Sequence, residues 1–158
     1  MHPVLEELLA RAPVVLDGAW GTQLQARGLE PGLSPDGWNL THPERVEEVA
    51  RAYVDAGSRI ILTNTFGATR LGQERYGFAD RVAEINRAGA EISKRAARDQ
   101  AKVFASMGPT GKMLMSGETT EDELAAVFQE QAAALAAGGA DGIVVETMSD
   151  PVEARVAV

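Results

Sequence analysis

Four short apolar runs recur along the chain, and each is followed by a segment with helical periodicity. The runs occupy residues 14–17, 60–65, 102–107 and 143–146. Strands that alternate with helices predict a parallel sheet with right-handed crossovers. Because the runs are almost continuously apolar, we expect the sheet to be covered on both faces. The sequence therefore predicts an α/β fold built from four strand–helix units.

The segments between these runs carry helix signals. A short amphipathic helix is expected before the first run, from the spacing of Val4, Leu5, Leu8 and Leu9. Capping boxes at Thr41–Glu44 and Thr120–Glu123 predict two helix starts. Another helix is expected from about Asp80, and a fourth crossover helix from Asp150. Residues 18–40 form a long connection, which in a compact domain is usually functional.

Two architectures fit this alternation, a doubly wound open sheet and part of a (βα)8 barrel. A complete barrel needs about 250 residues. The chain has 158 residues, and four units would make half of a barrel.

Composition narrows the classes of function. The net charge of −8 disfavours binding to nucleic acid or to an anionic membrane. No apolar run is long enough to span a bilayer, and the N-terminus carries acids where a secretion signal needs positive charge, so we expect a cytoplasmic protein. The chain has no cysteine and only two histidines, which argues against a zinc site made from this chain alone.

Each apolar run becomes polar where it ends. The residues at these ends are Asp17, Asn64, Thr65, Ser106 and Glu146. In parallel α/β folds the carboxyl ends of the strands lie on one side, and ligands bind there. The alternative is that these residues are ordinary caps and turn residues, which is the stronger reading for Ser106.

The residue types at these ends indicate a zwitterionic ligand. Two carboxylates, Asp17 and Glu146, cannot both stay ionised and unpaired in a confined site, and an ammonium group would satisfy them. Backbone N–H groups around Gly18–Thr22 could hold a carboxylate. Phosphorylated ligands are disfavoured, because no glycine-rich phosphate loop follows a strand. A small amino acid fits both halves of this site.

Five segments of the chain resemble the homocysteine S-methyltransferase domain family. That family includes the N-terminal module of cobalamin-dependent methionine synthase and the betaine–homocysteine methyltransferases. The similar segments, in the order and spacing of the family, are residues 16–22, 38–44, 63–68, 108–110 and 146–147.

The resemblance implies a (βα)8 barrel that methylates the sulfur of homocysteine, with zinc held by three cysteines. It implies a binding site for the amino-acid end of homocysteine, and it assigns no catalytic residue in this chain. The implied substrate-binding residues are Asp17, Gly18, Ala19, Gly21, Thr22, Asn64, Thr65, Phe66 and Glu146. The methyl donor stays open, since methylcobalamin, betaine and S-methylmethionine all serve within the family.

The chain departs from the family in having no cysteine. We therefore expect residues 1–158 to be a single domain, the N-terminal half of the barrel, ending in the fourth helix and inactive alone. The expected partners are homocysteine, the C-terminal half of the barrel with its zinc, and a second copy that covers open sheet edges. One alternative is a non-catalytic half-barrel that binds an amino acid or self-assembles. The other is an unrelated open-sheet enzyme.

Overall fold

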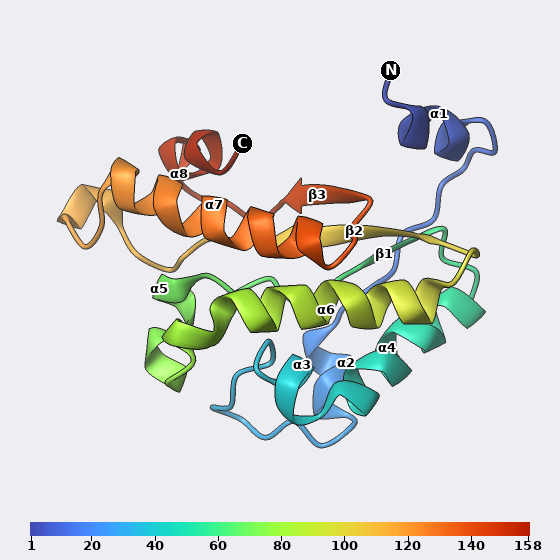
Figure 1. Ribbon diagram of the computed structural model, residues 1–158, viewed down its shortest axis with the longest axis horizontal. Helices are drawn as coiled ribbons and strands as arrows, with labels where there is room; N and C mark the ends of the chain where they lie inside the picture. Colours follow the sequence, from blue (N-terminus) through green and yellow to red (C-terminus); the bar gives the residue numbers. More distant parts are fainter.

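Three parallel strands form the sheet in the computed structural model, which describes all of residues 1–158 (Figure 1). They are β1 (Ile60–Leu62), β2 (Lys102–Met107) and β3 (Gly142–Val145), in the order β1-β2-β3. Leu62 pairs with Phe104, and Phe104 pairs with Gly142. The α/β class and the parallel sheet predicted from the sequence are confirmed, although β1 ends before the expected residue Thr65.

The expected first strand at residues 14–17 is not a strand of this sheet. Leu16 forms only an isolated parallel bridge with Ile60, with the Asp17 N–H donating to the Ile60 carbonyl at 3.0 Å. The pairing stops because the Asp17 side chain accepts the N–H of Leu62, at 2.7 Å, in place of a backbone carbonyl. The sheet therefore has three strands and one bridged segment, not four strand–helix units.

The helices include the four that the sequence predicts to follow the runs and the short one before them. They are α1 (Pro3–Leu9), α2 (Gly21–Gln25), α3 (Trp38–Thr41), α4 (Pro43–Asp55), α5 (Arg70–Gln73), α6 (Val82–Ala97), α7 (Glu121–Ala137) and α8 (Pro151–Ala157). Short 3₁₀ turns span Glu74–Tyr76, Ala79–Arg81 and Leu114–Ser116. The long connection over residues 18–40 is thus ordered by α2 and by the start of α3. None of the helices is both long and apolar enough to cross a membrane.

The helix start predicted at Thr120 is confirmed, but the Glu123 side chain accepts from the Thr119 hydroxyl at 2.9 Å and does not complete a capping box. Thr120 accepts the Glu123 N–H at 3.2 Å and begins α7. The box at Thr41 is wrong, because Thr41 is the last residue of α3 and its hydroxyl donates to the Gly37 carbonyl. Helix α4 begins at Pro43, and His42 at its cap makes no side-chain bond there.

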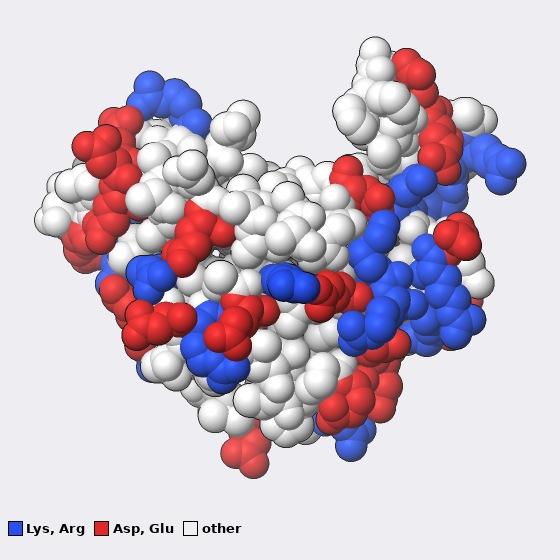
Figure 2. Space-filling model, viewed as in Figure 1, with Lys and Arg blue, Asp and Glu red and all other residues white.

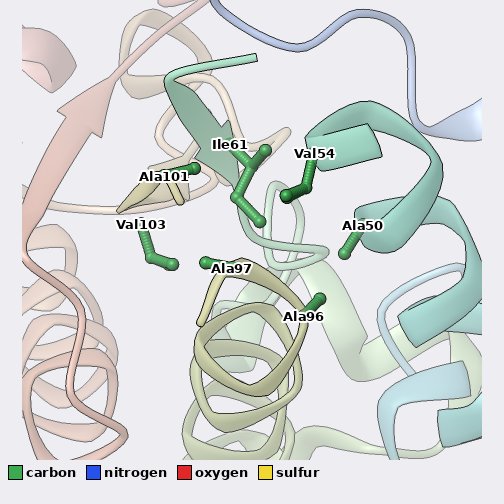
Figure 3. Close-up of a cluster of buried hydrophobic side chains, with 7 residues drawn as sticks. All are labelled: Ala50, Val54, Ile61, Ala96, Ala97, Ala101 and Val103. Atoms are coloured by element: carbon green, nitrogen blue, oxygen red, sulfur yellow. The ribbon is translucent and has the colours of Figure 1, made fainter. Parts of the chain in front are cut away.

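Small side chains let α4 and α6 pack closely on one face of the sheet (Figure 3). Ile61 and Val103 point from β1 and β2 toward these helices, which lie on one side of the strands in Figure 1. The buried residues of this cluster are Ala50, Val54, Ile61, Ala96, Ala97, Ala101 and Val103. A second cluster joins the end of β2 to α7 through Ala105, Met107, Leu124 and Phe128.

The opposite face of the sheet is less well covered than the sequence predicts. Leu62, Phe104 and Val144 lie on that face by strand alternation, and all three stay partly exposed. The expectation that both faces are buried is therefore not met within residues 1–158.

The two ends of the sheet differ in the charged residues around them. Figure 2 shows Lys and Arg side chains gathered near α1 and the C-terminal end of α6. Arg59 and Lys102 lie there, at the N-terminal ends of β1 and β2, where Lys102 pairs with Glu7 at 2.8 Å. The carboxyl ends of the strands lie at the opposite side, away from this basic region.

We predict that Gly89→Ala destabilises the fold by about 1–3 kcal/mol, although alanine is the better helix former. A Cβ on Gly89 would lie 2.6 Å from Asn39 Nδ2 and 2.7 Å from Thr65 Cγ2. Gly21→Ala is the matched control, because its Cβ would meet no atom within 4 Å. Urea unfolding of the two variants checks this, and equal stabilities would contradict the packing described here.

Candidate functional site

A cavity of about 770 Å³ opens at the carboxyl ends of the strands. Leu62, Ser106 and Glu146 line it from the three strand ends, and Gly18 lines it from the segment bridged to β1. Of the five polar residues predicted at the strand ends, Asn64, Ser106 and Glu146 line this cavity. The chemistry of the cavity depends on which polar atoms are left without partners.

Asp17 is held by one of its two carboxylate oxygens. Oδ2 accepts the Leu62 N–H at 2.7 Å and the Trp20 Nε1–H at 2.8 Å. No hydrogen bond from the protein reaches Oδ1. Partial burial raises the pKa of Asp17, the two N–H donors oppose that rise, and the nearby charge of Glu146 adds to it. A cation beside Asp17 would offset the cost of burying its negative charge and the repulsion from Glu146.

The loop after Asp17 presents unused donors. The backbone N–H groups of residues 18–22 have no acceptor within the chain, and Gly18, Ala19 and Gly21 line the cavity. Tyr53 on α4 fixes this loop, because its hydroxyl donates to the Ala19 carbonyl at 2.8 Å. An anionic group could therefore bind to a loop that is already ordered.

Glu146 follows β3 directly and is also held by one oxygen. Its Oε1 accepts the Ser106 hydroxyl at 2.5 Å, and Oε2 has only a 3.5 Å contact with the Thr147 hydroxyl. Thr147 has a φ of 59°, an uncommon conformation for a β-branched residue, and it turns the chain away immediately after Glu146. Like Asp17, Glu146 therefore keeps one carboxylate oxygen available to a ligand.

The other predicted residues divide into two groups. Asn64 lines the cavity and is fixed by donating to the Pro35 carbonyl at 2.7 Å, and Phe66 lines it with 42% of its surface exposed. Asp17, Thr22 and Thr65 do not line the cavity themselves, although Asp17 directly precedes the lining residue Gly18. Thr65 is fully buried beneath it and donates to the Ser106 carbonyl at 2.8 Å.

Asp36 is a cavity residue that the sequence reasoning missed. It is buried, and it accepts from the Gly67 N–H and from Gln73 Nε2, each at 3.1 Å. Burial raises its pKa to about 6, partly opposed by these bonds and by the charge of Arg75. In the sequence Asp36 sits between a proline and a glycine, a pattern typical of an ordinary turn, so no local signal indicates its burial.

The described residues do not fit a zinc site. No group of three or more His, Cys, Asp or Glu side chains could hold a metal ion. His2 caps α1 by accepting the Val4 N–H, and His42 stacks on Trp38 with ring centroids 4.6 Å apart. The three cysteines that the resemblance implies have no counterpart among these residues.

Comparison with known proteins agrees with the resemblance. The family model described as homocysteine S-methyltransferase matches residues 14–158. The chain therefore belongs to the homocysteine S-methyltransferase family.

Two methionine synthases are similar to nearly the whole chain. The chain is 35% identical to that of Mycobacterium tuberculosis and 34% identical to that of Mycobacterium leprae, with 98% of this chain covered in each case. It spans only 14% of the length of either relative.

A solved structure is similar in fold as well. The homocysteine methyltransferase MmuM from Escherichia coli, in its metallated form, has a TM-score of 0.81 and 25% identity to this chain. The match covers 94% of this chain and 59% of that one. The oxidised form of the same protein gives the same TM-score.

We predict that stability falls as the pH rises from about 4 to about 6, through the titration of Asp36. In this window the folded state keeps the Asp36 proton while the unfolded chain releases it, so the unfolded state gains stability. The difference between the pKa of 3.8 and about 6 corresponds to about 3 kcal/mol. Urea unfolding of Asp36→Asn across this range should lack that loss.

Asp55→Asn is the matched control for this titration, because Asp55 is exposed. Its pH profile should follow that of the unmodified chain. An Asp36→Asn profile parallel to both would show that Asp36 titrates normally.

Proposed function

We propose that residues 1–158 bind the amino-acid end of homocysteine and form the substrate-binding part of a methionine-forming homocysteine S-methyltransferase. One observation carries the proposal. Glu146 lines the cavity together with a run of unpaired backbone N–H groups after Asp17, and Asp17 itself lies next to the lining residue Gly18, near enough for the charge of Glu146 to raise its pKa; each carboxylate keeps one free oxygen. This combination matches the two charges of an amino acid.

In the proposed complex the substrate ammonium lies between Asp17 Oδ1 and Glu146 Oε2. Its carboxylate accepts from the N–H groups of Gly18 through Thr22, so Thr22 contributes backbone only. Charge-assisted hydrogen bonds of this kind are the strongest that a small polar ligand makes. Asn64 and Phe66 line the remaining wall, and Thr65 supports the site from beneath.

Methylation requires a reactive sulfur. A thiol with the usual pKa of about 8.5 is mostly protonated at neutral pH, and coordination to zinc would supply the thiolate. Residues 1–158 lack a fitting ligand set, so we assign no step to zinc here and propose that its cysteines lie outside this segment. The methyl donor stays open, with methylcobalamin one candidate, and the cytoplasmic location stays a prediction.

We also propose that this segment is the first half of a (βα)8 barrel. The match to 59% of the E. coli homocysteine methyltransferase supports this, as does the partly exposed sheet face carrying Leu62, Phe104 and Val144. In a barrel, that face would be covered by side chains from the remaining strands.

We predict that Asp17→Asn and Glu146→Gln each weaken L-homocysteine binding to residues 1–158 by about 10-fold or more, since each removes a charged acceptor for the ammonium. Isothermal titration calorimetry measures this. Glu91→Gln, on α6 and outside the cavity lining, is the control and should bind as the unmodified chain does. Unchanged affinity in both site variants would refute the proposed site.

We further predict no methionine formation by residues 1–158 alone when zinc, homocysteine and each candidate methyl donor are supplied. The reason is that the described residues offer no metal-ligand cluster. Measured turnover would contradict the proposed division of the enzyme. If homocysteine binds without turnover, but added polypeptide carrying the second half also fails to restore turnover, the non-catalytic binding module is the better description.

A second copy of the chain is the partner we propose for the isolated segment. Val15, Leu16 and Ile143, at the bridged segment and the edge strand, are 53%, 50% and 42% exposed. Open sheet edges with apolar side chains favour association. Sedimentation velocity at micromolar concentration should show a species larger than a monomer, reduced by Ile143→Asp but not by Leu5→Asp, a residue equally exposed on α1. A monodisperse monomer would contradict this.

A further inference from the structure

A ring of hydrogen bonds fixes the backbone of Ser106 at the end of β2. The Ser106 N–H donates to Thr63 Oγ1 at 3.0 Å, and the Thr65 hydroxyl donates to the Ser106 carbonyl at 2.8 Å. The two threonine oxygens lie 2.5 Å apart. Each hydroxyl has one hydrogen, and that of Thr65 is already used. The Thr63 hydroxyl must therefore donate to Thr65, which closes the ring.

Burial keeps this ring intact. Thr63, Thr65 and Ser106 are 2%, 0% and 3% exposed, so water does not compete for these bonds. The ring uses the main-chain N–H and C=O of Ser106 but not its side chain. The Ser106 hydroxyl is left to donate its hydrogen to Glu146 Oε1, at 2.5 Å across the paired strands. Its direction is set by the ring behind it.

We infer that Ser106 is a positioning residue that selects for the amino group of the substrate by aiming Glu146. The inference rests on the proposed function. Ser106 occupies Glu146 Oε1 and holds the carboxylate so that Oε2 stays available at the cavity. Without this bond the Glu146 carboxylate keeps only the 3.5 Å contact of Oε2 with the Thr147 hydroxyl, so nothing fixes the direction of its oxygens. Removal of the Ser106 hydroxyl therefore weakens the contact between Glu146 and the substrate ammonium, and it leaves the contacts between the loop N–H groups and the substrate carboxylate unchanged.

The test compares two probes, L-homocysteine and 4-sulfanylbutanoate, which has the same carboxylate and thiol but no amino group. Ser106→Ala should lower the ratio of the two affinities by about 10-fold, through weaker homocysteine binding alone. Ser93→Ala is the matched control. Ser93 is another fully buried serine, and its hydroxyl donates to the Leu62 carbonyl at 3.1 Å. Its ratio should not change.

A purely structural role for Ser106 would weaken both probes equally, and that result overturns the inference, as does an unchanged ratio. Ser106→Cys keeps the volume but donates weakly, so it provides the same comparison if Ser106→Ala does not fold. Ser106→Thr, which restores the hydroxyl, should recover part of the preference. If the unmodified chain shows no preference for the amino compound, the proposed function itself fails, and this inference fails with it.

Discussion

The hydrogen bond from the Leu62 N–H to Asp17 Oδ2 is the contact on which the site depends. It replaces the next backbone pairing between the bridged segment and β1, so the chain leaves the sheet at Asp17. The same oxygen accepts from Trp20, which draws the following loop back over the strand end. A single carboxylate oxygen thus ends the pairing and orders the loop, while the other oxygen stays free.

Much of the fold could be predicted from periodicity. The runs at residues 60–65, 102–107 and 143–146 contain real strands, and the helix starts at Thr120 and Asp150 follow ordinary capping rules. The run at 14–17 is equally apolar, yet it forms a single bridge. The sequence pattern shows the apolar character of this run, but it does not show that the side chain of its last residue, Asp17, will accept the next backbone N–H of β1.

The sequence predicts the main polar residues of the candidate site, but it does not predict the buried residues that hold them in place. Asp17, Glu146 and the glycine loop stand out because polar residues follow apolar runs. Asp36 and Thr63 do not stand out, because their roles come from burial and from partners distant in sequence, such as Gln73 and Ser106. Thr65 looks like a cavity residue from its position after a strand, but it is fully buried and its hydroxyl donates to the Ser106 carbonyl.

The account can be tested most directly by NMR titration of ¹⁵N-labelled residues 1–158 with L-homocysteine. The two ends of the sheet offer very different environments, one with unpaired N–H groups and free carboxylate oxygens, the other with Arg59 and Lys102. Binding through an amino acid's two charges should shift the backbone amides of residues 18–22 and the indole N–H of Trp20. Shifts confined to the basic end, or none at saturating ligand, would contradict the account.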